Sequence, residues 1–297
     1  MSTDCALTIV VAVKDAAANL ADLSTRLGSA ASSGNQLLFV FAGPPPDGWT
    51  PPPGGETLSS PENTLIPELW RDGILRARGK HVALTSAHCL PSPDWVATLL
   101  AADLQKNVGV GGVIELDPRC SPVHKSIYLL RYLAFAPPQR ARAVADIAAD
   151  NAIYRRAEIM AHPQLLAKGF WEPSFHRRFA TEGLSLCVAP AIRVGYRGRE
   201  LAGDFARQRL QHGREYGESR SRALPLLRRV AYLLASPLVP FVILTRVTRR
   251  AFRGDIYLRA LPVASPWLLW FIASWSIGEI GGYLNAVLRP ARGEERS

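Results

Sequence analysis

Short runs of apolar residues alternate with helical patterns along the first two-thirds of the chain. The runs at residues 6–13, 36–41, 81–85 and 108–114 are long enough for buried strands and too short for helices. Helical spacing follows the first run, and a further helix is expected to begin soon after the third. Strands that alternate with helices predict an α/β fold, with a mostly parallel sheet flanked by helices.

A segment dense in proline and glycine, residues 44–61, interrupts this alternation. Proline has no backbone N–H to donate, and glycine adopts backbone angles that other residues avoid. Both properties favour turns over regular structure. We therefore expect an irregular surface loop here.

Two uncharged apolar runs, residues 230–245 and 260–278, dominate the C-terminal region. Each run contains proline, and each is at or below the roughly 20 residues that a helix needs to cross a bilayer. Tryptophans in the second run and arginines beside both runs are typical of helices at the level of lipid headgroups. We expect interfacial or re-entrant helices over residues 230–297, with a hairpin in a soluble core as the alternative.

The net charge is +10, and nearly all of the excess lies after residue 196, where arginine is present and lysine is absent. Arginine beside apolar runs suggests an anionic membrane surface or a phosphate-bearing ligand as the partner. Nucleic acid is not expected as a partner, because no recognisable nucleic-acid-binding module accompanies the charge. A basic amphipathic helix is expected over residues 201–229, with lipid contact favoured for Arg222, Arg228 and Arg229.

The four cysteines are scattered, with no paired spacing that would indicate a disulfide framework or a zinc site. The N-terminal region has no basic segment followed by a long apolar segment, so we expect no signal peptide. Reduced thiols of this kind favour a protein at the cytoplasmic face of the membrane.

A polar loop from Ser86 to Cys89 is the first candidate for chemistry. It directly follows the buried strand at residues 81–85, and Pro91 and Pro93 separate it from the next helix. Ligands in open α/β sheets lie beyond the carboxyl ends of the strands. The loop occupies that position.

The sequence around this loop resembles the centre of a family 2 glycosyltransferase, a nucleotide-sugar enzyme of GT-A type. The resemblance is carried by Gly73-Ile74, Ala77-x-Gly79, the apolar strand and Pro91-x-Pro93-Asp94-Trp95. It continues in order through Asn151-x-x-x-Arg155-Arg156, and covers roughly residues 6–196.

The resemblance implies roles for several residues. Lys14 and Asp15 stand where the family contacts the nucleotide, and Asn151 stands near the position of the donor sugar. Glu172 occupies one place of the family's Glu-Asp pair, so it is the candidate base that deprotonates the acceptor hydroxyl. His176 is the nearby alternative.

The chain departs from the family where acidic residues are usual. Ser86-Ala87-His88 replaces the Asp-x-Asp that holds a divalent cation, and Pro173 replaces the second carboxylate. Manganese or magnesium remains possible, with His88 as the candidate ligand, although metal independence is the preferred expectation. We expect Ser86, His88 and the arginines of the 201–229 helix to bind the donor diphosphate instead, namely Arg207, Arg209 and Arg214.

Three domains are therefore expected: a GT-A-like domain over 1–200, the basic helix over 201–229, and the apolar helices over 230–297. The predicted function is a membrane-associated inverting glycosyltransferase that uses a nucleotide-diphosphate sugar. Its acceptor is expected to be a lipid-linked or cell-envelope glycan. The alternatives are a non-catalytic relative that acts as a binding or scaffold subunit, and a membrane-bound nucleic-acid binder.

Overall fold

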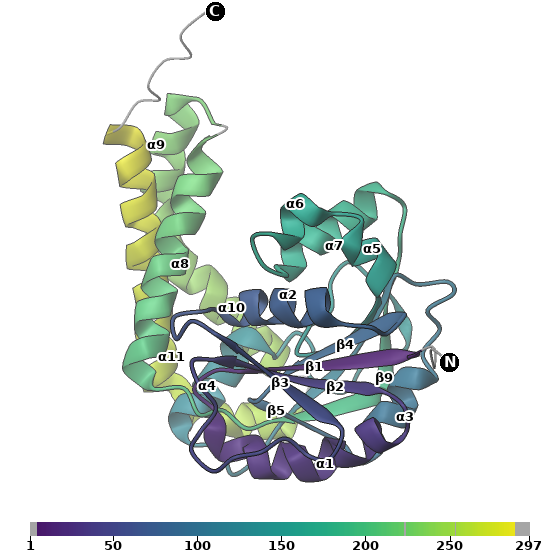
Figure 1. The fold of residues 1–297 in the computed structure, drawn as a ribbon. Helices are drawn as coiled ribbons and strands as arrows, with labels where there is room; N and C mark the ends of the chain where they lie inside the picture. Colours follow the sequence, from purple (N-terminus) through teal and green to yellow (C-terminus); the bar gives the residue numbers. More distant parts are fainter. Residues whose placement is uncertain (1–4, 223, 253, 289–297) are drawn as a thin grey trace, which may run out of the picture. The chain divides into compact units, whose positions relative to one another are not determined.

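The computed structural model describes residues 5–222, 224–252 and 254–288, which form two compact units (Figure 1). The sheet unit comprises Met1–Arg119 and Ala134–Arg199. The helical unit comprises Cys120–Leu133 and Glu200–Ser297. The segment Cys120–Leu133 therefore belongs with the C-terminal helices, although it lies inside the first domain expected from the sequence.

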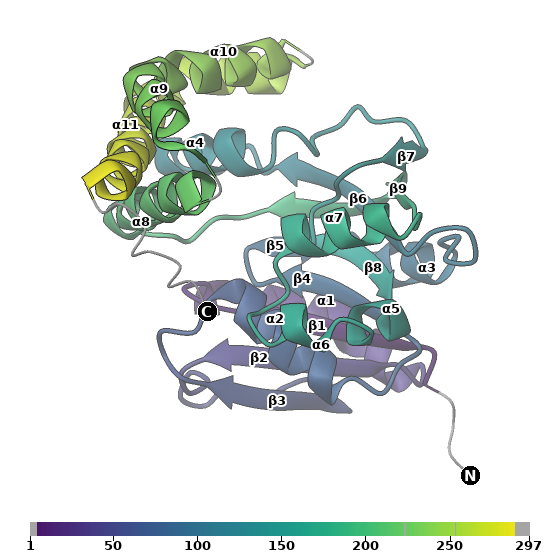
Figure 2. The ribbon, with the colours of Figure 1, turned by 90° about the horizontal axis from the view of Figure 1, so that it is seen from above.

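The sheet unit is organised on a single sheet. Within the described residues it has nine strands in the order β3-β2-β1-β4-β8-β6-β9-β5, with β7 paired to β9 (Figure 2). The half from β3 to β4 is parallel throughout, and the other half is mixed because β8 runs antiparallel to both neighbours. The predicted α/β fold is thereby confirmed. The strands are β1 Leu7–Val13, β2 Gln36–Ala42, β3 Gly55–Ser60, β4 His81–Ser86, β5 Cys89–Pro91, β6 Gly109–Leu116, β7 Arg142–Val144, β8 Asn151–Arg155 and β9 Leu186–Tyr196.

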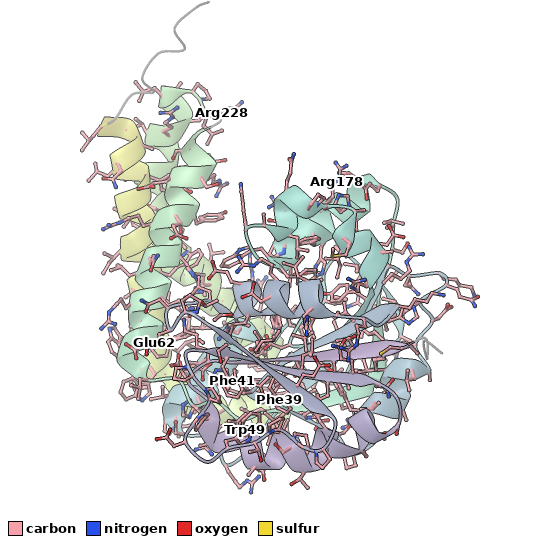
Figure 3. The ribbon with its side chains drawn as sticks, in the orientation of Figure 1. Phe39, Phe41, Trp49, Glu62, Arg178 and Arg228 are labelled. Atoms are coloured by element: carbon pink, nitrogen blue, oxygen red, sulfur yellow. The ribbon has the colours of Figure 1, made fainter. Side chains whose placement is uncertain are left out.

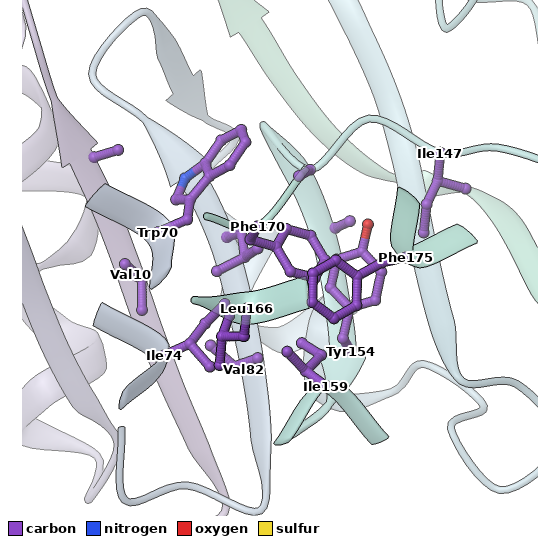
Figure 4. Close-up of a cluster of buried hydrophobic side chains, with 14 of the residues drawn as sticks. Val10, Trp70, Ile74, Val82, Ile147, Tyr154, Ile159, Leu166, Phe170 and Phe175 are labelled. Carbon is purple, nitrogen blue, oxygen red and sulfur yellow. The ribbon is translucent and has the colours of Figure 1, made fainter. Parts of the chain in front are cut away.

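Helices cover both faces of this sheet, with α2 over one face and α1 over the other (Figure 1). The face under α2 forms a continuous apolar core that includes Val10, Ile74 and Phe175 (Figure 4). Gly73 allows α2 to approach β1, because a Cβ atom there would lie 2.3 Å from Cγ1 of Val10. The helices of the unit are η1 Ala17–Asn19, α1 Leu20–Ser32, α2 Ile66–Arg76, α3 Trp95–Leu100, α5 Arg156–Met160, α6 Pro163–Leu166 and α7 Glu172–Thr181.

The expectation of an irregular loop over residues 44–61 is wrong for its second half. The prolines there end at Pro53 and resume at Pro61, so every residue of β3 has an N–H for the ladder with β2. Only the first half is irregular. There Trp49 packs edge-on against Phe39 and Phe41 of β2, with ring centroids 5.1 Å apart in each pair (Figure 3).

The helical unit is built around two long helices, α8 and α11. Glycines on both helices bring the two backbones into contact: a Cβ atom on Gly278 would lie 2.0 Å from the carbonyl oxygen of Leu210. Gly213, Gly217 and Gly282 are as tightly enclosed. Small residues spaced by four along a helix are a common means of such close packing. The helices are α4 Pro122–Arg131, α8 Ala202–Arg222, α9 Leu226–Ala235, η2 Ser236–Leu238, α10 Val239–Ala251 and α11 Asp255–Leu288.

Two helical stretches of this unit are long and apolar enough to cross a membrane, by length and composition alone. They are Leu226–Ala251, of 26 residues, and Asp255–Leu288, of 34 residues. The apolar runs alone are at or below the length of a span, but the helices continue through the prolines into the charged flanks. Pro262 and Pro266 lie inside α11, and Pro237 lies in the 3-10 turn η2 that joins α9 to α10.

Candidate functional site

The polar residues singled out by sequence gather where β1 and β4 end. Ser86 pairs with Ala12 across the sheet, so the Ser86–His88 loop and the segment after β1 share one edge. Lys14 begins that segment, and its ammonium group donates a hydrogen bond to the carbonyl of Thr64 at 3.1 Å. Asp15 is exposed and has a φ angle of 56°, a left-handed conformation that is costly for a residue other than glycine.

Ser86 is fully buried, and its hydroxyl donates a hydrogen bond to the carboxylate of Asp150. Asp150 directly precedes β8, whose first residue pairs with Thr85 at the end of β4. Sequence reasoning overlooked Asp150 in favour of its neighbour Asn151. The signal was nevertheless present, since a carboxylate stood beside the residue that the resemblance singled out.

Glu172 is held at the same end of the sheet. It is the first residue of α7, and its Oε1 atom accepts the backbone N–H of Ala149 at 2.7 Å. A carboxylate is stabilised at a helix N-terminus, and proline fits there because the first helical N–H groups have no partner within the helix. Pro173 therefore favours the start of α7. It stands where family 2 glycosyltransferases have their second carboxylate.

His176 lies one turn after Glu172 and is almost completely buried. Its Nδ1 contacts the carboxylate of Asp146, and its Nε2 lies 3.0 Å from the hydroxyl of Tyr154. Burial, followed by the nearby carboxylates of Glu172, Asp146 and Asp150, raises the pKa of Tyr154 well above its usual value. Tyr154 therefore keeps its proton at neutral pH, and its hydroxyl shares a hydrogen bond with Nε2 while Nδ1 is bonded to Asp146. Through its two ring nitrogens, His176 joins α7 to Asp146 and to Tyr154 of β8.

Asn151 has a different environment from the one expected near a donor sugar. It is fully buried in β8, and its Oδ1 accepts the indole N–H of Trp95 at 2.7 Å. Its amide donates to the carbonyls of Val113 at 2.8 Å and Ile192 at 3.1 Å. The side chain thus joins β8 to α3, β6 and β9, and contact with the donor stays a prediction.

Asn19, which the sequence did not single out, connects three segments at this edge. Its buried amide donates to the carbonyls of Ala87 at 2.8 Å and Arg197 at 3.0 Å. Its Oδ1 accepts the Nε–H of Arg199 at 3.1 Å. The backbone N–H of Arg197 also donates to the carbonyl of His88 at 2.7 Å. Arg199 is thereby brought to the Ser86–His88 loop, although the sequence pointed to arginines further along the chain.

The residues in the Asp-x-Asp position do not fit a divalent cation. The hydroxyl of Ser86 is engaged by Asp150, Ala87 has no ligating atom, and His88 is a single nearly buried imidazole. Across residues 5–222, 224–252 and 254–288, no group of three or more His, Cys, Asp or Glu side chains could hold a metal ion. A cation site normally needs several such ligands.

The arginines expected to bind the diphosphate lie on α8, in the helical unit. Arg207 forms an ion pair with Asp204 at 3.0 Å, and Arg209 lies over the ring of Trp275, 4.2 Å from its centroid. Burial and the nearby Arg131 lower the pKa of Arg209 to about 10, which leaves it protonated at neutral pH. Arg214 is exposed. The diphosphate contact predicted for these three residues remains a prediction.

An acidic residue, Glu62, lies beside the end of β2. Glu62 follows β3, is exposed, and approaches Gly43, whose Cβ position would be 3.2 Å from Cγ of Glu62 (Figure 3). The neighbouring backbones are joined by the hydrogen bond from Gly43 N–H to the carbonyl of Ser60, at 2.8 Å. Sequence order hid Glu62 because it follows the next strand along the chain, β3, and not β2 itself.

A cleft of about 530 Å³ opens at the ends of β6 and β9 in the sheet unit. Arginine and carboxylate side chains line it, and they pair with one another: Arg193 with Glu115, and Arg197 with Asp117 at 3.5 Å. Four arginines line the cleft against these two carboxylates, so an excess of positive charge remains.

The fold is shared with a solved glycosyltransferase. No protein-family model matches the sequence, and no curated protein matches it. Among solved structures, the chain is similar to the mannosyltransferase PcManGT from Pyrobaculum calidifontis, solved in complex with GDP-mannose and Mn²⁺. The TM-score is 0.53 at 13% sequence identity, over 94% of this chain and 88% of that chain. At this identity the likeness establishes a GT-A-like glycosyltransferase fold.

Proposed function

We propose that this protein is a glycosyltransferase that takes a sugar from a nucleotide-diphosphate sugar. The proposal is carried by Glu172, whose carboxylate is fixed by Ala149 at the carboxyl edge of a GT-A-like sheet. Lys14, Asp15 and the buried Ser86–Asp150 pair lie at the same edge. The similar mannosyltransferase binds GDP-mannose, which supports a donor of this class.

Glu172 serves as the base in an inverting transfer. Its carboxylate takes the proton of the acceptor hydroxyl, and the acceptor oxygen forms a bond to the anomeric carbon. The bond from that carbon to the diphosphate oxygen breaks, and its electron pair leaves with the nucleoside diphosphate. The hydrogen bond from Ala149 restricts rotation of the carboxylate, so the accepting oxygen is positioned in advance. No divalent cation takes part in this scheme.

Membrane association is proposed for the helical unit. Large apolar side chains of these helices are exposed: Leu227 by 81%, Leu234 by 75% and Phe241 by 67%. In a hairpin packed into the core of a soluble protein, such side chains would be buried. Arg228 (Figure 3) and Arg246 lie in the same two helices, α9 and α10, and suit an anionic surface. The acceptor is accordingly a lipid-linked or cell-envelope glycan, and the protein acts at the cytoplasmic face.

Donor binding and turnover test the proposal directly. Intact protein in detergent should bind at least one common nucleotide sugar in calorimetry and transfer its sugar to a lipid-linked acceptor. Glu172→Gln should lower turnover by about 10²–10⁴-fold and leave donor affinity within a few-fold. Glu182→Gln is the matched control, because Glu182 also lies at an end of α7 but pairs with Arg178. Absence of binding to every donor would refute the proposal.

A non-catalytic binding subunit is the second candidate. It is favoured by the replacement of the usual carboxylates with Ser86-Ala87-His88 and Pro173. Such a protein would bind donor or acceptor but show no transfer that depends on Glu172. Equal background rates in the wild type and Glu172→Gln, together with donor binding, would select this candidate.

A further inference from the structure

Arg209 is a partly buried cation of the helical unit without an acidic partner. Its guanidinium lies over the ring of Trp275, and its Nε atom is buried with no hydrogen-bond partner in the described part of the chain. No carboxylate of the described residues forms an ion pair with it. A cation taken out of water costs free energy unless an anion or hydrogen bonds replace the lost hydration. The aromatic ring offsets only part of that cost.

Two further basic side chains lie near Arg209 in the same unit. Burial, followed by the nearby Arg131 of α4, lowers the pKa of Arg209, and Arg131 itself pairs with Glu200 at 3.3 Å. Burial also lowers the pKa of His212; Glu215 raises it, and both arginines lower it further. Glu200 thus offsets charge on Arg131, whereas the charge of Arg209 stays uncompensated by the residues that the structure describes.

The face of α8 that carries Arg209 is aromatic. Phe205, Arg209 and Tyr216 follow one another at spacings of four and seven residues, so they share one face of the helix. The ring of Phe205 packs edge-on against Phe271 of α11, with centroids 4.8 Å apart. The ring of Tyr216 contacts Trp275 of α11, with centroids 5.8 Å apart. Aromatic contacts between α8 and α11 therefore lie on both sides of Arg209 along the helix.

This aromatic surface continues to the exposed side of α11. Trp270 stacks on Phe271, with ring centroids 5.6 Å apart, and both Trp270 and its neighbour Leu269 are exposed. Tryptophan is typical of the headgroup level of a bilayer, where the phosphate groups of lipids lie. An exposed apolar surface close to an uncompensated cation fits a ligand that combines a hydrocarbon chain with a negative charge.

We infer that Arg209 binds the phosphate group of a lipid whose hydrocarbon chain lies against the exposed apolar side of α11. A guanidinium offers paired N–H donors that match phosphate oxygens. The inference rests on the membrane part of the proposed function, because it names the group by which a lipid-linked acceptor is bound. It gives Arg209 a lipid partner in place of the donor diphosphate expected from the sequence.

Calorimetric binding of dodecyl phosphate to the intact protein in a neutral detergent tests the inference. Dodecanol and inorganic phosphate are measured alongside, since each carries only one part of the ligand's chemistry. Dodecyl phosphate should bind more tightly than either by about tenfold or more, because hydrocarbon burial and charged hydrogen bonds both contribute. Arg209→Met should weaken dodecyl phosphate by about tenfold to a hundredfold, since it removes hydrogen bonds between charged groups. Arg209→Lys should recover part of the loss.

Arg207→Met is the matched control, because Arg207 is an exposed arginine of the same helix that pairs with Asp204 at 3.0 Å. It should leave the affinity for dodecyl phosphate within about twofold of the wild type. Thermal unfolding gives a second readout. Without ligand, Arg209→Met should be at least as stable as the wild type, since it removes an uncompensated cation. Dodecyl phosphate should raise the unfolding temperature of the wild type more than that of Arg209→Met.

Wild-type affinity for dodecyl phosphate in Arg209→Met, or equal losses in Arg209→Met and Arg207→Met, would overturn the inference. Equal affinities for inorganic phosphate and dodecyl phosphate would make free phosphate the ligand and also overturn it. A loss of GDP affinity in Arg209→Met, with dodecyl phosphate affinity unchanged, would assign Arg209 to the donor instead. A lower unfolding temperature of ligand-free Arg209→Met would contradict an uncompensated cation. All of these results leave the proposed transfer standing, which fails only if the wild type binds no nucleotide sugar.

Discussion

The two units of this protein treat polar and apolar side chains in opposite ways. In the sheet unit, Asn19, Ser86 and Asn151 are fully buried and bound by hydrogen bonds. Among the described residues, its exposed large apolar side chains are Leu75 and Leu100. The helical unit exposes many more, from Leu201 to Leu288. The sheet unit thus has an internal polar network, whereas the helical unit exposes much of its apolar surface.

Loss of one buried amide should have the largest effect on stability. Asn151→Ala removes three hydrogen bonds and leaves the indole of Trp95 and two carbonyls without them. We expect a loss of about 3 kcal/mol in the free energy of unfolding of the sheet unit, measured by urea denaturation. Asn107→Ala, which removes a single exposed hydrogen bond to the carbonyl of Asp103, should cost less than about 0.5 kcal/mol. Equal losses in the two variants would contradict the picture of an essential internal network.

The helical unit should depend on backbone contact rather than on polar bonds. Gly278→Ala places a methyl group against the carbonyl of Leu210 and should destabilise the α8–α11 pair by about 2 kcal/mol. Circular dichroism can follow the thermal unfolding of these helices. Gly281→Ala is the control, because its nearest atom is Nε of Arg214 at 3.8 Å. A larger fall in unfolding temperature for Gly281→Ala than for Gly278→Ala would contradict the close backbone contact between α8 and α11.

Membrane contact should depend on the exposed apolar residues of one unit only. Phe241→Ser should lower partitioning onto vesicles that contain anionic lipid by about tenfold, since it removes a large apolar side chain from the interface. Leu75→Ser, at an exposed leucine of the sheet unit, should leave partitioning unchanged. Co-sedimentation measures both variants. If both behave like the wild type, the helical unit does not provide the lipid contact.

The smallest effect is expected at the Tyr154–His176 bond. Tyr154→Phe should cost about 1 kcal/mol at pH 7. The wild type should also lose stability above about pH 10, because Tyr154 then ionises only when unfolded, its folded pKa being higher. Tyr154→Phe should lack the part of this alkaline loss of stability that comes from ionisation of Tyr154. Unfolding free energies at pH 8 and pH 11 would show the difference, and identical pH dependence would rule it out.

The pattern of apolar residues along the chain was sufficient to predict most of the long strands of the sheet. The runs that became β1, β2, β4 and β6 consist of consecutive apolar residues, so burial on both faces could be predicted directly. β3, with sequence Gly-Glu-Thr-Leu-Ser-Ser, has no such run. It forms a strand because it pairs with β2 in the folded protein, and this pairing cannot be read from the local sequence.

The candidate site was predictable only where a residue follows its strand immediately. Lys14 follows β1 immediately and Ser86 is the last residue of β4, while Glu172 was singled out through the resemblance. Asn19 and Arg199 were missed because their contact joins positions 180 residues apart. Glu62 was missed because spatial adjacency to the end of β2 depends on the order of strands in the sheet.

The close approach of α8 and α11 also constrains how this sequence can vary. At residues 213, 217, 278 and 282, an added Cβ atom would lie within 2.6 Å of a carbonyl oxygen of the facing helix. Any residue with a Cβ atom would clash at these positions, whether its side chain is apolar, polar or charged. A library randomised at these positions and selected for folded protein should return glycine at all four. Homologues that keep the helix pair should likewise be recognisable by these glycines when the rest of their sequences has diverged.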